Sequence, residues 1–166
     1  MSLEEASVQE PENLVPASNA RKAPPRRIRV LIVDDIAENR AVLGVCCEQF
    51  GVGYEAVASG REAVDAVRSG RFDLVFMDIL MPGMDGVAAT RAIRLLPGPA
   101  SYIPIIAVTT AAERMDVLHY RANGITDVVP KPINVARLMD ALETAMMEVR
   151  RARRSQSRHS QVRLSA

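Results

Sequence analysis

Five short runs of apolar, mostly β-branched residues recur along the chain, and each is followed by residues with helical spacing. Short apolar runs of this kind are typical of strands that are buried on both faces of a parallel sheet. Their alternation with helical segments implies a parallel sheet covered by helices on both faces. The strands are expected at 28–33, 52–57, 74–77, 104–108 and 125–129, and the helices at 36–51, 59–70, 85–96, 111–122 and 134–149.

Chain length and connection rules narrow the topology. With right-handed crossovers, five strands in about 120 residues fit a flavodoxin-like doubly wound α/β sheet better than an eightfold barrel. We expect the strand order 2-1-3-4-5 with five helices. Two helix starts carry capping signals: Ser59 is followed three residues later by Glu62, as in a capping box, and Asn134 is a candidate N-cap.

Charge divides the chain into three parts, although the total is only +1. Residues 1–27 have no net charge and contain four prolines, which predicts a disordered, Pro-rich leader. Residues 28–148 carry a net charge of −5 and hold all the periodic segments. Residues 149–166 contain six arginines and no acid, and are expected to form an Arg-rich disordered tail.

Several classes of protein are disfavoured by composition. No apolar run approaches the ~20 residues that cross a bilayer, and the first thirty residues lack the apolar core of a signal peptide. We therefore expect a cytoplasmic protein. Cys46 and Cys47 are adjacent in a helical pattern, which suits reduced thiols better than a disulfide or a metal site.

Polar residues follow four of the five expected strands. In open α/β sheets, ligands bind beyond the carboxyl ends of the strands. Each residue has a simpler interpretation alone, as a helix cap, a turn residue or a solvated charge. Their shared edge favours a common site, and Lys131 is the only lysine between residues 28 and 148. The residues are Asp34 and Asp35 after the first strand, Asp78 after the third, Thr109 after the fourth and Lys131 after the fifth.

The chemistry of this set points to phosphate. Three clustered carboxylates raise one another's pKa unless a cation keeps them ionised, and oxygen ligands with room for water favour Mg²⁺. Such an ion can align one carboxylate for attack on phosphorus. Thr109 and Lys131 could then contact phosphoryl oxygens. The chain has no P-loop, no Gly-x-Gly-x-x-Gly after the first strand and no Ser–His pair, so the residues predict an aspartyl-phosphate site.

Four motifs in order resemble the receiver domain of two-component response regulators, over about residues 28–148. The residues of the first two motifs are most similar to those of receivers attached to hybrid histidine kinases. The motifs are Val33-Asp34-Asp35 with Asn39-Arg40, Met77-Asp78-Ile79-Leu80-Met81-Pro82-Gly83-Met84-Asp85-Gly86, Ile105-Ile106-Ala107-Val108-Thr109, and Lys131-Pro132.

The resemblance implies a role for each site residue. Asp78 would accept a phosphoryl group from a phosphohistidine. Asp35 would bind Mg²⁺ directly and Asp34 through water, while Asp78 and the backbone carbonyl of Leu80 complete the ligand set. Thr109 would be the switch hydroxyl. Lys131 would pair with the phosphoryl group, and the peptide bond that follows it is usually cis in this family.

Two positions depart from the family pattern. Val128 stands where the family commonly has an aromatic residue that changes rotamer on phosphorylation. Valine has no ring to move, so coupling from Thr109 to the fourth helix and the fifth strand must occur differently or be weaker. Thr110 replaces a usually smaller residue and narrows access to the phosphoryl group. Because Leu80 and Ala111 cannot orient an attacking water, we expect slow hydrolysis of the phosphorylated form.

Two functional classes stay open. The first is a phosphoacceptor switch, not an enzyme in the usual sense, that takes phosphate from a sensor histidine kinase or phosphotransfer protein and signals by docking to an unknown protein. The second is a receiver-fold interaction module without phosphotransfer; an aspartyl phosphatase is more distant. No sequence-specific nucleic acid or membrane span is expected, homodimerisation stays open, and Met1 with both tails favours a single-domain protein.

Overall fold

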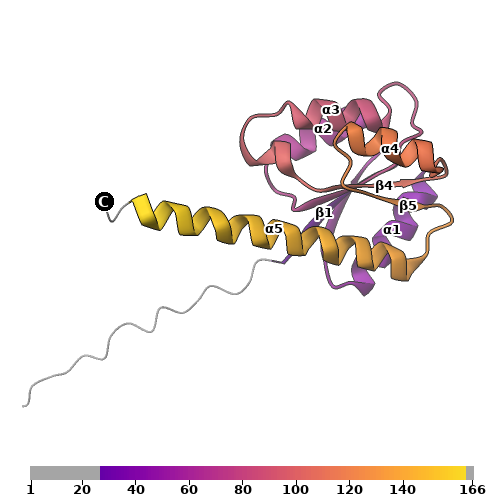
Figure 1. Cartoon of the computed structure of the whole chain (residues 1–166). Helices are drawn as coiled ribbons and strands as arrows, with labels where there is room; N and C mark the ends of the chain where they lie inside the picture. Colours follow the sequence, from indigo (N-terminus) through magenta and orange to yellow (C-terminus); the bar gives the residue numbers. More distant parts are fainter. Residues whose placement is uncertain (1–26, 164–166) are drawn as a thin grey trace, which may run out of the picture.

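The structure, a computed structural model, describes residues 27–163, so almost all of the expected leader, residues 1–27, lies outside it. Strands and helices alternate along the chain, with one additional 3₁₀ helix before the fourth strand (Figure 1). The elements are β1 (Arg29–Val33), α1 (Ala37–Gln49), β2 (Gly53–Val57), α2 (Gly60–Arg68), β3 (Leu74–Met77), α3 (Gly86–Arg94), η1 (Gly98–Tyr102), β4 (Ile105–Thr109), α4 (Arg114–Ala122), β5 (Asp127–Pro130) and α5 (Val135–Arg163).

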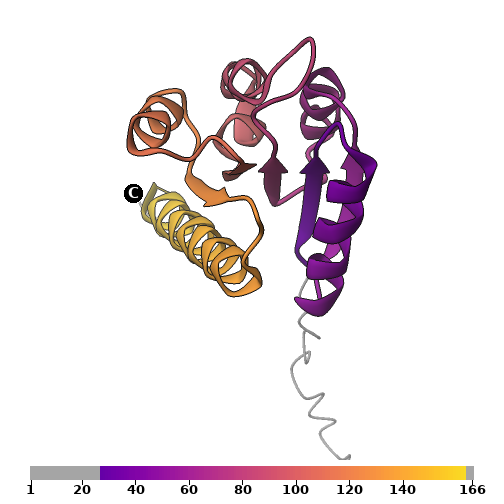
Figure 2. The ribbon, with the colours of Figure 1, turned by 90° about the vertical axis from the view of Figure 1, so that its right-hand side faces the viewer.

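The five strands form one parallel sheet in the order β2-β1-β3-β4-β5, which confirms the predicted flavodoxin-like topology. Successive strand residues face opposite sides of the sheet. Leu31 and Val33 therefore pack with α2, α3 and α4, whereas Val30 and Ile32 pack with α1 and α5. Figures 1 and 2 show these two helical layers on opposite faces of the sheet. Burial on both faces explains why the strands read as continuous apolar runs.

Two predicted caps are present. The Ser59 hydroxyl accepts a hydrogen bond from the Glu62 N–H, and the Glu62 carboxylate accepts one from Ala58 N–H in return. Asn134 Oδ1 accepts a hydrogen bond from the N–H of Arg137 at the start of α5. Local sequence was therefore sufficient to place the starts of these two helices.

Helix α4 begins at Arg114, three residues later than the sequence pattern suggested. The side chains of Glu113 and Asp116 form a capping box that fixes this start. Ahead of it, the N–H of Ala111 donates to Thr109 Oγ1 at 3.2 Å, so the chain makes a turn before it enters the helix. The helical spacing of apolar residues extends across this turn, so the sequence pattern gives no sign that the helix starts later.

Helix α5 continues to Arg163, so residues 149–163 are described as helical where the sequence suggested a disordered tail. The last part of that expected tail, residues 164–166, lies outside the described residues. Figure 1 shows the helix extending beyond the rest of the domain. No glycine or proline follows Pro132, and arginine, alanine and glutamine are good helix formers. A helix that is already nucleated by its packed turns can therefore continue through the arginines.

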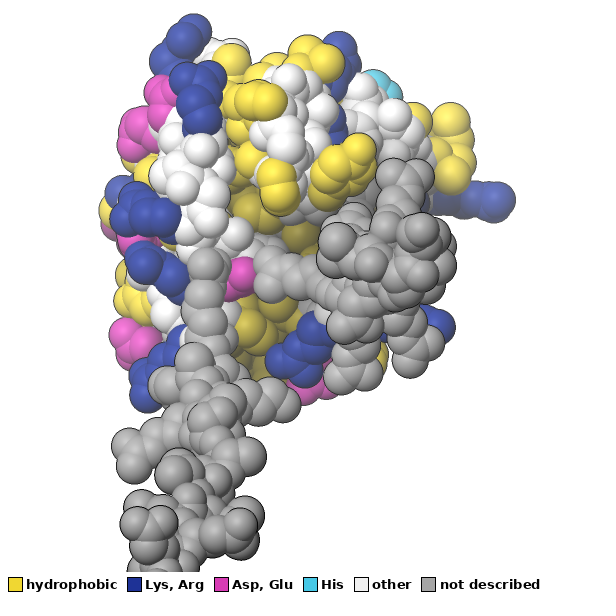
Figure 3. All heavy atoms as spheres, turned by 90° about the vertical axis from the view of Figure 1, so that its left-hand side faces the viewer, with side chains coloured by type: hydrophobic (Ala, Val, Ile, Leu, Met, Phe, Trp, Pro, Cys, Tyr) yellow, Lys and Arg dark blue, Asp and Glu magenta, His cyan; other side chains and the backbone are white. Residues whose placement is uncertain are grey.

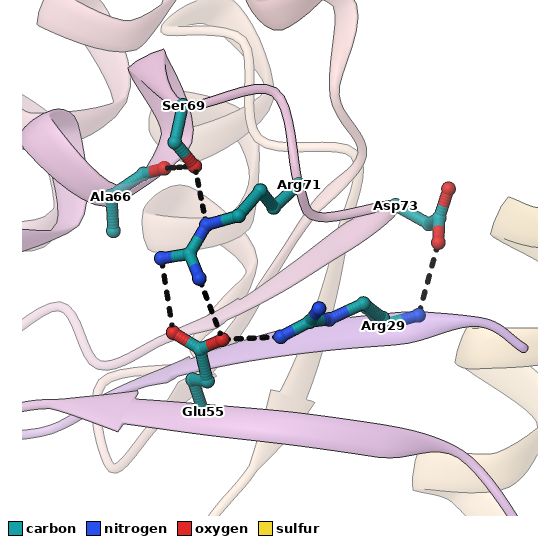
Figure 4. Close-up of polar contacts among 6 residues, drawn as sticks. All are labelled: Arg29, Glu55, Ala66, Ser69, Arg71 and Asp73. Carbon is teal, nitrogen blue, oxygen red and sulfur yellow. Dashed lines mark hydrogen bonds and ion pairs between the residues drawn. The ribbon is translucent and has the colours of Figure 1, made fainter.

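A polar network holds the beginning of the sheet (Figure 4). Glu55 on β2 pairs with both Arg29 on β1 and Arg71 before β3. The backbone N–H of Arg29 donates to Asp73 Oδ2 at 3.0 Å, and both guanidinium groups lie within 6 Å of the Phe72 ring centroid, at 5.8 and 5.5 Å. This network joins β1, β2 and the α2–β3 connection at the end of the sheet away from the strand-end carboxylates.

Apolar side chains gather on the face where the strands begin (Figure 3). Phe72, Tyr102 and Val149 are among the residues that line a hollow at this end of the molecule.

Cys46 and Cys47 are buried free thiols, and burial raises the pKa of Cys47 to about 12. Among the helices of the described residues, none is both long and apolar enough to cross a membrane.

Candidate functional site

Three carboxylates meet at the carboxyl end of the sheet. Asp34 and Asp35 follow β1, and Asp78 follows β3, the neighbouring parallel strand, in a register that pairs Val33 with Met77. One oxygen from each carboxylate lies within 4.8 Å of the other two. The structure thus brings together residues that are more than forty positions apart in the sequence.

Lys131 enters the same cluster from the end of β5. Its ammonium Nζ lies 2.8 Å from Asp34 Oδ2 and 3.5 Å from Asp78 Oδ1. The Lys131 N–H donates to the carbonyl of Thr109 at 2.9 Å, which ties the end of β5 to the end of β4. The Lys131-Pro132 peptide bond is cis, as the resemblance implied.

Asp34 is fully buried and extensively hydrogen-bonded. Besides the Lys131 contact, its Oδ1 accepts hydrogen bonds from the N–H of Ile36 at 2.9 Å and from Asn39 Nδ2 at 3.1 Å. A buried charge needs such partners, and these hold the carboxylate in one orientation. Asp34 is therefore a fixed part of the site.

Arg40 holds the backbone that carries the acidic pair. Its Nη1 donates to the carbonyl oxygen of Asp34 at 2.8 Å and to that of Asp35 at 3.1 Å. Asn39 and Arg40 belong to the first sequence motif, which by itself indicates no role for either residue. The sequence feature that could have suggested a role is their position in the first turn of the helix that follows the two acids.

Asp35 differs from its neighbour. Its Oδ1 is buried and has no hydrogen-bond partner, the only such side-chain atom among the described residues. An unpaired buried carboxylate oxygen is costly unless an ion or water satisfies it. Together with two further carboxylates within 4.8 Å, it makes a donor set that fits a hard divalent cation such as Mg²⁺.

Asp78 is almost completely buried. Burial raises its pKa above the usual value for aspartate, an effect that the Lys131 ammonium partly opposes. The Asp34 carboxylate also raises the pKa, and the backbone N–H groups of Ile79 and Leu80 lower it by hydrogen bonding to the Asp78 carboxylate. The nearby cation and the backbone donors therefore favour the ionised form, against the cost of burial.

The backbone behind Asp78 leaves no room for a side chain at Gly86. A Cβ atom there would lie 2.2 Å from the carbonyl oxygen of Asp78 and 2.8 Å from Ile79 Cα. The Gly86 N–H also donates to the Ile79 carbonyl at 2.9 Å. This glycine, at the start of α3, lets the helix approach the strand end that carries Asp78.

Thr109 ends β4, the strand next to β3, and is fully buried. Its hydroxyl oxygen accepts the hydrogen bond from Ala111 N–H rather than contacting a carboxylate. Thr110 beside it is exposed, and Val128 is buried in β5. Leu80 presents an exposed side chain at the rim, with 58% of its surface accessible.

A family model for the response regulator receiver domain matches residues 30–143. The chain belongs to the response regulator receiver family. Sensor protein GacS of Pseudomonas syringae is 40% identical over 115 residues, and transcription factor SKN7 of Chaetomium thermophilum is 37% identical over 119 residues. Those matches cover 68% and 69% of this receiver but only 13% and 15% of the two longer relatives.

Solved receiver structures share the fold. Chemotaxis protein CheY4 of Vibrio cholerae matches with a TM-score of 0.66 at 29% identity, covering 72% of this chain and 98% of that one. The receiver domain of sensor histidine kinase PA1611 of Pseudomonas aeruginosa matches with a TM-score of 0.65 at 31% identity, covering 71% and 96%. That PA1611 structure has a magnesium ion coordinated in its active-site cleft.

Proposed function

We propose that this receiver is a phosphoacceptor switch in which Asp78 takes a phosphoryl group from a phosphohistidine in the presence of Mg²⁺. The observation that carries the proposal is the position of Asp78 between two further carboxylates and the Lys131 ammonium, 3.5 Å from Asp78 Oδ1. A carboxylate nucleophile needs charge compensation when a phosphoryl group approaches it. Lys131 offers one cation beside Asp78, and Mg²⁺ held by the neighbouring carboxylates would supply the second.

Metal binding is assigned to the acidic cluster. Asp35 would bind Mg²⁺ directly through its unpartnered oxygen, Asp34 would act through water, and Asp78 and the Leu80 carbonyl would complete the protein ligands. The bound ion would neutralise charge on the phosphoryl oxygens. Asp34 already has three hydrogen-bonding partners, which suits a role through water better than direct binding.

Phosphoryl transfer would form one bond and break one. An Asp78 carboxylate oxygen attacks phosphorus, the P–N bond to the donor imidazole breaks, and its electron pair stays on the imidazole nitrogen. Lys131 pairs with a phosphoryl oxygen of the resulting acyl phosphate. Thr109 would have to exchange its Ala111 hydrogen bond for one to the phosphoryl group, which would couple the reaction to the β4–α4 turn.

The partners follow from this chemistry. The donor would be a sensor histidine kinase or a histidine phosphotransfer protein, and the phosphorylated receiver would signal by docking to a downstream protein in the cytoplasm. We expect slow dephosphorylation, because the rim residues Leu80 and Ala111 offer no side-chain group to orient an attacking water. A phosphorylated half-life of only seconds in magnesium buffer would contradict this part of the proposal.

Intact-mass measurement tests the central step. The protein is incubated with acetyl phosphate and Mg²⁺ and then weighed, and we expect a single added phosphoryl group. The adduct should be absent from Asp78→Asn and from samples treated with a chelator. No adduct on the wild-type chain with acetyl phosphate or with phosphoramidate would favour the alternative, an interaction module without phosphotransfer.

A further inference from the structure

Helix α5 carries a basic segment away from the receiver body. Among the helix residues whose burial is described, those up to 151, the last largely buried one is Met146, and Val149 is half-buried. The helix continues to Arg163. At 1.5 Å per residue, the turns after Val149 extend for about 21 Å. Figure 1 shows this part of the helix running beyond the end of the sheet at which the strands begin.

The arginines of this segment lack acidic neighbours. Residues 149–166 contain six arginines and no aspartate or glutamate. Arg150 and Arg151 are exposed, and neither forms an ion pair or hydrogen bond among the described side chains. Arginines of the body are mostly paired, as Arg121 and Arg137 are with Asp127. Among the described side chains, Arg150 and Arg151 therefore hold positive charge that no acidic group of the fold neutralises.

Helical periodicity places four of the arginines on one side of α5. In the packed turns, Leu138, Leu142 and Ala145 are buried, whereas Glu143 and Met147 are exposed. Positions 150, 151, 154 and 158 continue the spacing of the exposed residues and lie within about 100° of the helix circumference. We call Arg150, Arg151, Arg154 and Arg158 the basic stripe.

We infer that the basic stripe binds the phosphate backbone of duplex nucleic acid without reading its sequence. Guanidinium groups bind phosphate oxygens in a bidentate manner, and a duplex presents one negative charge per about 1.7 Å of its axis. The four positions span about 12 Å of helix, so several phosphates come within reach of a single helix face. The receiver body, at −5, offers no comparable attraction.

An anionic membrane is the less suitable partner for the same charges. Helices that lie on a membrane bury large apolar side chains such as leucine, phenylalanine or tryptophan opposite their basic face. Between residues 150 and 163 the only apolar residues are Ala152 and Val162. This composition supplies electrostatic attraction but little apolar area for insertion, and it favours a partner that is recognised by phosphate charge alone.

Fluorescence anisotropy with the full chain and a labelled duplex of about 20 base pairs tests the inference. Between about 50 and 200 mM salt, log affinity against log salt should fall with a slope of about −4, as expected for four released counterions. In the variant R150Q/R154Q/R158Q, the slope of log affinity against log salt should become less negative by about 3, and binding should weaken more than tenfold at the lowest salt. Glutamine keeps the helix propensity, which circular dichroism would check.

The control variant R61Q/R68Q/R114Q removes the same formal charge from the body, and it should bind the duplex within about twofold of wild type. Equal losses in the two triple variants would overturn the inference, as would tighter binding of the wild-type chain to phosphatidylserine vesicles than to the duplex. Asp78→Asn should retain duplex binding. Duplex binding therefore tests the basic stripe independently of phosphorylation, so failure of one proposal can be distinguished from failure of the other.

Discussion

Lys131 Nζ lies 2.8 Å from Asp34 Oδ2, and the Asp34 side chain has no solvent-accessible surface. The pair joins the end of β5 to the end of β1, across the two strands that lie between them in the sheet. The same ammonium reaches Asp78 at 3.5 Å. One cation thus contacts both the buried Asp34 carboxylate and the proposed phosphoacceptor, so its removal should slow phosphorylation without weakening metal binding.

Lys131→Gln should slow phosphorylation of Asp78 by about 100-fold, because the group that compensates charge on the phosphoryl oxygens is lost. Its Mg²⁺ affinity should stay equal or increase, because a positive charge beside three carboxylates is removed. Phosphorylation is followed by intact mass with acetyl phosphate, and Mg²⁺ binding by titration calorimetry. A parallel loss of both properties would indicate that Lys131 only maintains the structure of the site.

Asp78 should destabilise the metal-free protein at neutral pH. Its pKa is raised in the folded state, chiefly by burial, so the folded protein binds a proton more tightly than the unfolded chain does. The stabilisation that comes from this tighter proton binding is present at low pH. It is lost as the pH rises through the pKa that Asp78 has in the folded protein. Asp78→Asn, which stays neutral, should therefore unfold at a higher temperature than wild type at pH 7.

The pH dependence distinguishes this explanation from a simple packing effect. The stability difference between Asp78→Asn and wild type should shrink as the pH falls toward the ordinary aspartate value of 3.8. Thermal unfolding is measured in chelator at several pH values, with Asp65→Asn on the exposed side of α2 as the matched control. A difference that is constant over the whole pH range would refute the electrostatic explanation.

The sheet and the acidic cluster were accessible from sequence for a common physical reason. Strands buried on both faces, such as Val30–Val33, must be continuously apolar, so the first polar residue marks the strand end where Asp34 and Asp78 lie. Parallel pairing then brings these ends to one edge. The apolar pattern thus predicted both the topology and the convergence of the carboxylates.

Other features depend on three-dimensional contacts that no periodic pattern records. The two hydrogen bonds from Arg40, in the first turn of α1, join its side chain to the backbone carbonyls of the acidic pair that precedes the helix. The late start of α4 depends on the capping box at Glu113. The length of α5 has a different origin: charge composition suggested disorder after Val149, but most of the residues from 150 to 163 are arginine, alanine or glutamine, which are good helix formers, and they continue a packed helix.

Arg40 should act on Mg²⁺ binding through position rather than charge. Arg40→Met removes the two hydrogen bonds that fix the carbonyls of Asp34 and Asp35. Loss of an outer-shell partner typically lowers metal affinity by about 10- to 100-fold, and we expect a decrease of at least tenfold here. Loss of the positive charge alone would strengthen Mg²⁺ binding, so the sign of the change separates the two effects.

Titration calorimetry with Mg²⁺ measures this decrease. Arg68→Met is the matched control, because Arg68 is an exposed arginine on α2 whose ion pair joins it to Asp65 in its own helix. It should leave the affinity within about twofold of wild type, since a screened surface pair contributes little. Unchanged or tighter Mg²⁺ binding by Arg40→Met would show that the acidic pair keeps its geometry without the guanidinium.

Gly86 should be intolerant of even one added carbon. In Gly86→Ala the new Cβ would lie 2.2 Å from the Asp78 carbonyl oxygen, and the backbone of β3 cannot move aside as a flexible side chain could. Overpacking of this kind costs about 1–3 kcal/mol or more of unfolding free energy, measured by urea denaturation, and should also slow phosphorylation of Asp78. Gly53→Ala on β2 is the control, since its Cβ would meet its nearest neighbour at 3.7 Å. If the two alanine variants were equally stable and equally phosphorylated, α3 would not need to approach the Asp78 strand end this closely.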